Sequence, residues 1–245
     1  MQHYRDDLAF IHNAGFGGLA EHAASFLLEQ LHEQHLDRGL VVDLGCGSGI
    51  LAERLSIAGY SVLGIDLSNA MIELARRRAP EAEFRVQSLL ATVFPPCIAV
   101  TAIGEIFNYD FDDRAGLEAL KDMAARVYHA LPPEGVFMFD AAAPGRVPGG
   151  STKTFFEGDD WSVLVTADET AEPQLVTRRI TSYRKVDPGQ YRRDDETHQL
   201  KLFTRVEVNA LLENAGFRVT LLERYGSHDL LPGLPVYLAV KPGSG

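Results

Sequence analysis

A glycine-rich turn between a predicted strand and a predicted helix is the part of this sequence best suited to bind a ligand. The apolar run Leu40–Leu44 contains Asp43, and glycines follow at positions 45, 47 and 49. Apolar residues at helical spacing begin directly afterwards, over residues 50–58. Glycines let backbone approach a ligand closely, and a helix N-terminus presents free N–H groups. A strand, tight turn and helix in this order therefore predict a cradle for a nucleotide-like ligand.

The charges around this turn indicate which ligand it takes. Residues 47–52 fit the relaxed dinucleotide pattern G-x-G-x-x-G/A, and Asp66 stands where a ribose-binding acid belongs. A dinucleotide brings a diphosphate, however, and residues 43–52 contain Asp43 but no Lys or Arg. Acids here and at Glu105 favour a cationic ligand such as S-adenosylmethionine, which carries a sulfonium and an ammonium. An NAD(P)-dependent oxidoreductase remains the alternative interpretation.

Strand and helix patterns alternate along most of the chain that must position these residues. We expect strands at 40–44, 61–66, 84–87, 98–103, 135–140, 217–222 and 234–240. We expect helices at 17–36, 47–58, 68–80, 114–130 and 204–216. This alternation predicts an α/β fold with a doubly wound, Rossmann-like sheet.

The pattern changes between the fifth strand and the last helix. From 154 to 203 the apolar period is near two, and residues 172–174 and 187–190 have the composition of hairpin turns. We expect three or four antiparallel strands inserted into the domain. Arg178, Arg179, Arg184, Arg192 and Arg193 fall here among acidic residues, which favours a self-neutralised surface.

Several motifs, in order, resemble those of the class I S-adenosylmethionine-dependent methyltransferases. Residues 42–49 (VDLGCGSG) look like the family's first motif, residues 64–68 (GIDLS) its second, and residues 102–109 a variant of its fourth. Residues 211–217 resemble its last helix and turn. The resemblance covers about residues 35–140 and 204–241. It implies a seven-stranded sheet of order 3-2-1-4-5-7-6 and S-adenosylmethionine as cofactor, with S-adenosylhomocysteine as product.

The resemblance also implies a domain organisation. Residues 37–145 and 203–245 would form the cofactor-binding core, and residues 1–36 an N-terminal helical lid segment. Residues 146–202 would form an antiparallel β insertion that covers the substrate.

Roles at the methionine end of the cofactor follow from the same resemblance. Gly45, Cys46 and Gly47 would offer backbone groups to the methionine moiety, and Asp43 would help to orient it. Cys46 is expected to be a small loop residue rather than a nucleophile, because no base stands near it in the sequence.

At the nucleoside end, Asp66 would accept from both ribose hydroxyls and Leu67 would pack on the adenine. Ile103 and Gly104 would close the site beside the sulfonium. Many family members place an acid after the third strand, near the adenine amino group, but residues 87–90 contain none. The hydroxyl of Ser88, or backbone, would substitute.

Candidates for the acceptor side come from three parts of the chain. Glu105 and Tyr109 follow the fourth strand, where this fold places its reacting centre, although Glu105 equally fits a structural acid that caps the loop. His198 and Glu196 share one strand face, which suits substrate binding or an exposed cross-strand pair.

Tyr4, His12 and Phe16 lie in the N-terminal lid segment. His12 precedes the flexible stretch 15–18, and it suits either a lid that contacts substrate or an ordinary surface histidine.

Composition argues against several classes of partner and of structural site. The 245 residues carry a net charge of −11, which disfavours nucleic acid and anionic membranes as partners. Two cysteines without metal-ligand spacing predict no disulfide framework and no metal site, and the absence of a signal-peptide pattern predicts a cytoplasmic protein.

We predict a methyltransferase acting on an N or O atom of a small molecule, as a monomer or homodimer. A methyltransferase-like protein that binds cofactor without catalysis is the third hypothesis.

Overall fold

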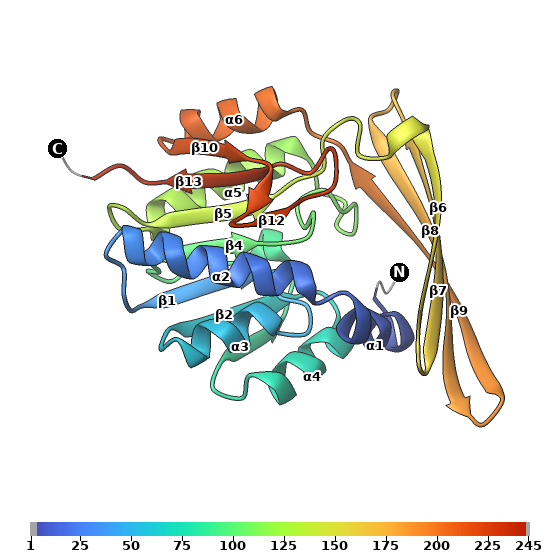
Figure 1. Cartoon of the computed structure of the whole chain (residues 1–245). Helices are drawn as coiled ribbons and strands as arrows, with labels where there is room; N and C mark the ends of the chain where they lie inside the picture. Colours follow the sequence, from blue (N-terminus) through green and yellow to red (C-terminus); the bar gives the residue numbers. More distant parts are fainter. Residues whose placement is uncertain (1–3, 244–245) are drawn as a thin grey trace.

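A seven-stranded sheet with helices on both faces forms the core of the computed structural model, which describes residues 4–243 (Figure 1). Its parallel strands are β1 (Leu40–Leu44), β2 (Ser61–Asp66), β3 (Glu83–Val86), β4 (Ala99–Ala102) and β5 (Val136–Asp140). β13 (Val236–Val240) runs antiparallel to β5, and β10 (Arg218–Leu222) runs antiparallel to β13. The order β10-β13-β5-β4-β1-β2-β3 confirms the predicted 3-2-1-4-5-7-6 arrangement.

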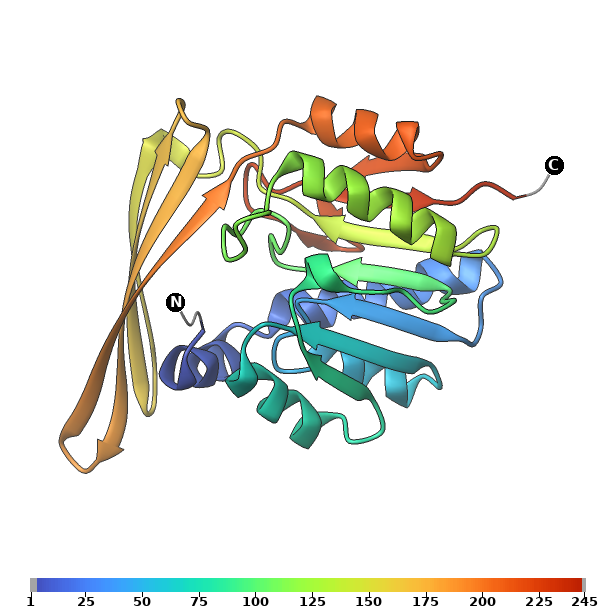
Figure 2. The same ribbon diagram turned by 180° about the vertical axis from the view of Figure 1, so that it is seen from behind.

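Helices cover both faces of this sheet, which explains why its central strands are mostly apolar (Figure 2). One face carries α2 (Gly18–Glu33), α3 (Ile50–Ile57) and α4 (Asn69–Arg78), and the other carries α5 (Leu117–Ala130) and α6 (Arg205–Asn214). Every residue of β5 is buried. Most of the buried apolar side chains thus belong to two core clusters, one on each side of the sheet.

Local capping fixes where the helices begin. The Ser68 hydroxyl accepts from the N–H of Met71 at the start of α4, and Thr204 with Glu207 forms a capping box on α6, as the sequence predicts for both N-caps. α5 begins at 117 rather than 114. The preceding residues form a loop, in which Asp112 accepts from the backbone N–H of Arg114.

The insertion is a separate four-stranded antiparallel sheet beside the carboxyl edge of the core sheet (Figure 1). It comprises β6 (Ser151–Gly158), β7 (Trp161–Thr170), β8 (Leu175–Asp187) and β9 (Gln190–Lys201), paired in chain order. Turns fall at 171–174 and 188–189, close to the predicted positions.

The first helix, α1 (Asp6–Gly15), packs against β7 and β8 on the side of the insertion that faces the core (Figure 1). The remaining elements are short: η1 (Leu89–Ala91), η2 (Pro148–Gly150), β11 (Arg224–Tyr225) and β12 (His228–Asp229). Within residues 4–243, no helix combines the length and apolarity needed to cross a bilayer. α1 and the insertion together close off the carboxyl edge of the sheet, where the candidate site lies.

Candidate functional site

The glycine turn after β1 adopts backbone conformations that favour glycine at all three positions. Gly45, Gly47 and Gly49 have φ values of 67°, 52° and 79°. A Cβ on Gly45 would lie 2.5 Å from Cδ1 of Ile106, and one on Gly49 would lie 2.9 Å from Cα of Ala75. A Cβ on Gly47 would meet nothing within 4 Å. Two of the glycines are therefore required by packing, whereas Gly47 borders open space.

Asp66, the last residue of β2, contacts this glycine turn through its side chain. Its carboxylate accepts from the N–H of Gly47 at 2.9 Å and from the N–H of Ser68 at 2.8 Å. Burial raises the pKa of Asp66, and these backbone hydrogen bonds oppose the increase. The carboxylate is thus fixed in place at the wall of a cavity.

Asp43 is part of β1 and lies within the core sheet. It is buried, and its carboxylate accepts a hydrogen bond of 2.7 Å from the hydroxyl of Thr101 on β4. Burial raises the pKa of Asp43 to about 7. The Cys46 thiol is also buried, with a pKa raised by burial, which fits a packing role and not a nucleophile. Neither Asp43 nor Cys46 is among the residues that line the cavity.

The cavity opens along the carboxyl ends of β1, β2 and β4 and encloses about 1110 Å³, including solvent at its mouth. Of the residues predicted to bind cofactor, the following line it: Gly45, Gly47, Asp66, Leu67, Ser88, Ile103 and Gly104. The predicted lid residues Tyr4, His12 and Phe16 line it too, together with Tyr109. Most of the predicted site residues are therefore brought together around one space.

An acidic side chain that the sequence did not reveal lies beside Ser88. The Ser88 hydroxyl donates to Asp112 at 2.6 Å, and both residues line the cavity. Arg114, which also contacts Asp112, holds the pKa of that carboxyl well below its usual range. An acid therefore lies beside Ser88 at the cavity wall, and it comes from the loop before α5 rather than from the residues after β3.

Aromatic side chains form the opposite part of the cavity wall. The hydroxyls of Tyr4 and Tyr109 are 3.0 Å apart, and the ring of Tyr109 stacks on Phe111 with centroids 4.6 Å apart. His12 meets Tyr4 edge-on, with ring centroids 5.5 Å apart, and Phe16 lies beside His12. These side chains come from the N-terminal segment and from the loop after β4, so two distant parts of the sequence build one wall.

His12 is the one titratable imidazole among the residues that line this cavity. Burial lowers its pKa to about 4, so the ring is neutral near pH 7. Its Nδ1 is buried and has no hydrogen-bond partner within residues 4–243. The position supports the predicted lid contact over the alternative of a surface histidine.

Glu105 is a buried structural acid and does not line the cavity. Its carboxylate is held by Arg146 at 2.5 Å and by Arg178 of β8 at 2.7 Å. Burial by itself would raise the pKa of Glu105, but the two guanidinium groups outweigh it and bring the pKa to about 2. The expectation of a self-neutralised arginine surface is therefore wrong for Arg178, which points inward to this ion pair.

Asp140, at the end of β5, anchors the same loop. Its carboxylate accepts from the N–H groups of Gly104 and Glu105, at 2.9 and 2.6 Å, and from the Tyr225 hydroxyl at 2.8 Å. The loop takes left-handed backbone at both Gly104 and Glu105. These contacts hold it in a shape that turns Gly104 toward the cavity.

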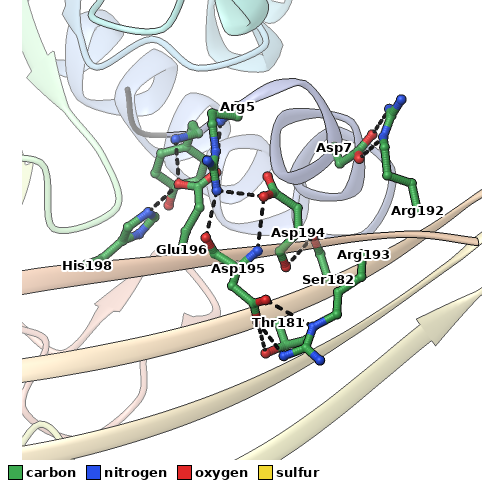
Figure 3. A network of polar contacts seen from close by, with 11 residues as sticks. Arg5, Asp7, Thr181, Ser182, Arg192, Arg193, Asp194, Asp195, Glu196 and His198 are labelled. Atoms are coloured by element: carbon green, nitrogen blue, oxygen red, sulfur yellow. Dashed lines mark hydrogen bonds and ion pairs between the residues drawn. The ribbon is translucent and has the colours of Figure 1, made fainter. Parts of the chain in front are cut away.

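Glu196 and His198 form a buried pair on β9, not an exposed one (Figure 3). Nε2 of His198 lies 2.8 Å from Oε2 of Glu196. Burial would raise the pKa of Glu196, but His198 and the backbone N–H groups of Arg5 and Tyr4 together lower it. His198 does not line the cavity but packs behind Tyr4, with ring centroids 5.0 Å apart.

No group of three or more His, Cys, Asp or Glu side chains within the described part of the chain is arranged to hold a metal ion.

Comparison with known proteins identifies related sequences and folds. Residues 41–135 match the family model described as a methyltransferase domain. The dTDP-4-amino-2,3,4,6-tetradeoxy-D-glucose N,N-dimethyltransferase of Saccharopolyspora spinosa is 27% identical over 80% of this chain and 74% of its own length.

Solved structures with the same fold include two methyltransferases. One is an S-adenosylmethionine-dependent methyltransferase of Clostridium acetobutylicum, with TM-score 0.79 and 20% identity over 96% of this chain and 98% of that one. The other is CalS10, an amino pentose methyltransferase of Micromonospora echinaspora, with TM-score 0.75 and 20% identity over 94% of this chain and 96% of that one.

Proposed function

Because this chain belongs to the class I S-adenosylmethionine-dependent methyltransferases, we propose that it methylates an amine nitrogen of a small molecule. The observation that carries the choice of acceptor is the composition of the cavity wall. Among the described residues that line it, none is Lys or Arg, whereas Asp66 and Asp112 are acidic and four of the acceptor-side residues are aromatic. An amine and its methylated cationic product suit such a wall, because aromatic faces and carboxylates attract cations.

The nicotinamide alternative is not supported by the fold. A dinucleotide-binding sheet has the order 3-2-1-4-5-6, whereas here the antiparallel β13 lies between β5 and β10. The turn also presents no cation to a diphosphate.

The cofactor would lie across the glycine turn. In this arrangement Asp66 accepts from the ribose hydroxyls, while the backbone at Gly45 and Gly47 holds the methionine end. Asp112 and Ser88, which line the cavity, would contact the adenine amino group, and Leu67 would cover the ring. Asp43 does not line the cavity, and with a pKa raised to about 7 it would add negative charge beneath the cationic end only in its ionised form.

The acceptor would enter on the aromatic side, between the N-terminal segment and Tyr109. Methyl transfer from a sulfonium is a one-step displacement, so alignment of nucleophile, methyl and sulfur is the main requirement and is worth roughly 7–11 kcal/mol. An amine that arrives protonated must first lose a proton. His12, neutral at pH 7 and lining this side, would accept a hydrogen bond from the amine and orient the nitrogen.

The relatives provide independent support for an amine. A Saccharopolyspora enzyme named for N,N-dimethylation of an amino sugar covers most of this chain, and an amino pentose methyltransferase shares its fold. An acceptor of this class places a nitrogen among hydroxyl groups, which would hydrogen-bond to the phenols of Tyr4 and Tyr109.

The test is a methylation assay with paired acceptors. The purified protein would be incubated with S-adenosylmethionine and a panel of amino sugars, each matched with the analogue that carries a hydroxyl in place of the amine, and products would be identified by mass spectrometry. Methylated amine without methylated hydroxyl analogue is the expected result. Methylation of the hydroxyl analogues alone would contradict the choice of nitrogen, and tight S-adenosylhomocysteine binding without turnover would favour the non-catalytic hypothesis.

A further inference from the structure

The carboxylate of Glu196 binds two consecutive backbone N–H groups at the start of the N-terminal segment. Oε2 accepts from the N–H of Tyr4, and Oε1 accepts from the N–H of Arg5, each at 2.9 Å. His198 contacts Oε2 at 2.8 Å from the same strand, so it holds the carboxylate in one orientation (Figure 3). Charge-assisted hydrogen bonds of this kind are stronger than neutral ones, and a carboxylate next to the N-terminus of α1 also complements the helix dipole.

The backbone at Tyr4 takes a conformation that needs such a clamp. Its φ is 50°, in the left-handed region that bulky residues seldom adopt. A strained residue of this kind persists only when its surroundings hold it, and strain of this kind is concentrated at functional sites. The surroundings here are Glu196 on one side and Ser68 on the other, whose hydroxyl donates to the Tyr4 carbonyl at 2.8 Å.

These contacts place Tyr4 between the two halves of the cavity. On one side Ser68, whose hydroxyl donates to the Tyr4 carbonyl, also donates its backbone N–H to Asp66. On the other side the Tyr4 hydroxyl lies 3.0 Å from that of Tyr109. One clamped residue thus touches both the predicted ribose-binding side and the predicted acceptor side.

A second carboxylate anchors the next turn of the lid. Asp7 is buried and receives Arg192 Nε at 2.5 Å and Arg184 at 3.2 Å, both from the insertion (Figure 3 shows the pair with Arg192). Arg184 also lies over the ring of Phe10, 4.0 Å from its centroid. α1 is therefore fixed to the insertion along its first turns, and its orientation determines where His12 lies.

We propose that Glu196 is the positioning residue of the acceptor site: by clamping the backbone of Tyr4 and Arg5, it places the Tyr4 phenol and His12 against the acceptor. The proposal rests on the proposed function for the identity of the acceptor side. Glu196 itself lies outside the cavity and acts through the backbone it holds.

The test compares Glu196→Gln with Asp195→Asn. Asp195 is the neighbouring residue of β9, and its exposed carboxylate binds Arg193 and Thr181 rather than the lid, which makes it a matched control (Figure 3). Glutamine keeps the size of the side chain but turns an NH2 group toward one of the two backbone donors. We expect faster amide hydrogen exchange over residues 4–15 in Glu196→Gln and unchanged exchange in β1, β2 and β4. We expect the acceptor KM to rise on the order of 10-fold or more, with S-adenosylhomocysteine affinity within about threefold of wild type.

Tyr4→Phe tests the role of the Tyr4 hydroxyl separately from the contacts by which Glu196 holds the Tyr4 backbone. This variant keeps the backbone contacts and removes the hydroxyl, so we expect wild-type exchange over residues 4–15 together with a loss of acceptor turnover. Unchanged lid exchange in Glu196→Gln would overturn the proposal, as would faster exchange throughout the core or unaltered kinetics in Tyr4→Phe. The exchange measurement needs no substrate, so a failure to find an amine acceptor would count against the proposed function and leave the clamp tested independently.

Discussion

Arg178 binds Glu105 through two of its guanidinium nitrogens, at 2.7 and 3.0 Å, and so ties the insertion to the loop after β4. Both side chains are largely buried, and they lie 73 residues apart in the sequence. The pair fixes the insertion over the carboxyl edge of the sheet, where the cavity opens. Its energetic importance follows from burial, because a charge left without its partner in the interior is costly.

Arg178→Met should therefore destabilise the protein by about 3 kcal/mol, since Glu105 would keep only Arg146 as a partner. Arg179→Met is the matched control. Arg179 is the next residue on β8, its side chain is 61% exposed, and it pairs with Asp168 at the surface, so its loss should cost less than about 1 kcal/mol. Urea unfolding of the two variants provides the measurement, and equal costs would show that the buried pair adds no stability.

The Arg178–Glu105 pair also shows which features of the insertion could be predicted from the sequence. Val176, Arg178 and Ile180 alternate along β8, and Val176 and Ile180 are buried. Strict application of the two-residue period places Arg178 on the same inward face. The interspersed acids of the hairpin favoured a surface interpretation instead, although the pattern that contradicts it was present.

The same period explains the correction for His198. It alternates with Glu196 and Leu200 on β9, and Leu200 is fully buried. Buried polar residues on such a face require partners, which His198 and Glu196 supply to each other and Glu196 to the lid.

The sequence could predict that the proposed cofactor-binding residues meet at one cavity, because the features that position them are local. The glycine turn and Asp66 follow strands that the apolar pattern identifies, and parallel strands bring their carboxyl ends to one edge. Asp112 was not predictable. Its contact with Ser88 spans 24 residues and depends on the conformation of the loop before α5, which no periodic pattern describes.

Asp66→Ala should weaken binding of S-adenosylhomocysteine. Loss of hydrogen bonds between a carboxylate and the ribose costs about 1.5–3 kcal/mol, or on the order of 10–100-fold in affinity. Asp37→Ala, an exposed acid remote from the cavity, is the control and should leave affinity unchanged. Isothermal titration calorimetry would decide, and wild-type affinity in Asp66→Ala would remove Asp66 from this role.

Gly47 and Gly49 should respond differently to the same added methyl group. In Gly49→Ala the Cβ would lie 2.9 Å from the Cα of Ala75, so the contact between α3 and α4 must shift and stability should fall. In Gly47→Ala the Cβ projects into open space, so only the left-handed backbone opposes it, at a cost of about 1 kcal/mol. Thermal unfolding should therefore rank Gly49→Ala as the less stable variant.

Cofactor affinity should separate the two glycines further. We expect Gly47→Ala to weaken S-adenosylhomocysteine binding while the protein stays folded, since the methyl group occupies space beside the ligand. Full affinity in a folded Gly47→Ala variant would show that the cofactor does not approach the turn at this residue.

Asp43 should make stability depend on pH in a direction unusual for a carboxylate. Its folded-state pKa is raised to about 7 from an ordinary value of 3.8, because burial favours the neutral form. The folded state thus binds the proton more tightly than the unfolded state between these values, and the stabilisation is complete below the unfolded pKa. It is lost as the pH rises through about 7.

Asp43→Asn tests this linkage, because asparagine keeps an oxygen for the Thr101 hydroxyl and does not titrate. Between pH 5.5 and pH 7.5 the wild type should lose about 2 kcal/mol of unfolding free energy relative to the variant. Urea unfolding of both proteins at the two pH values measures the difference directly. A difference between wild type and Asp43→Asn that stays constant over this range would show that Asp43 is ionised in the folded protein throughout, with its charge stabilised by the surrounding turn.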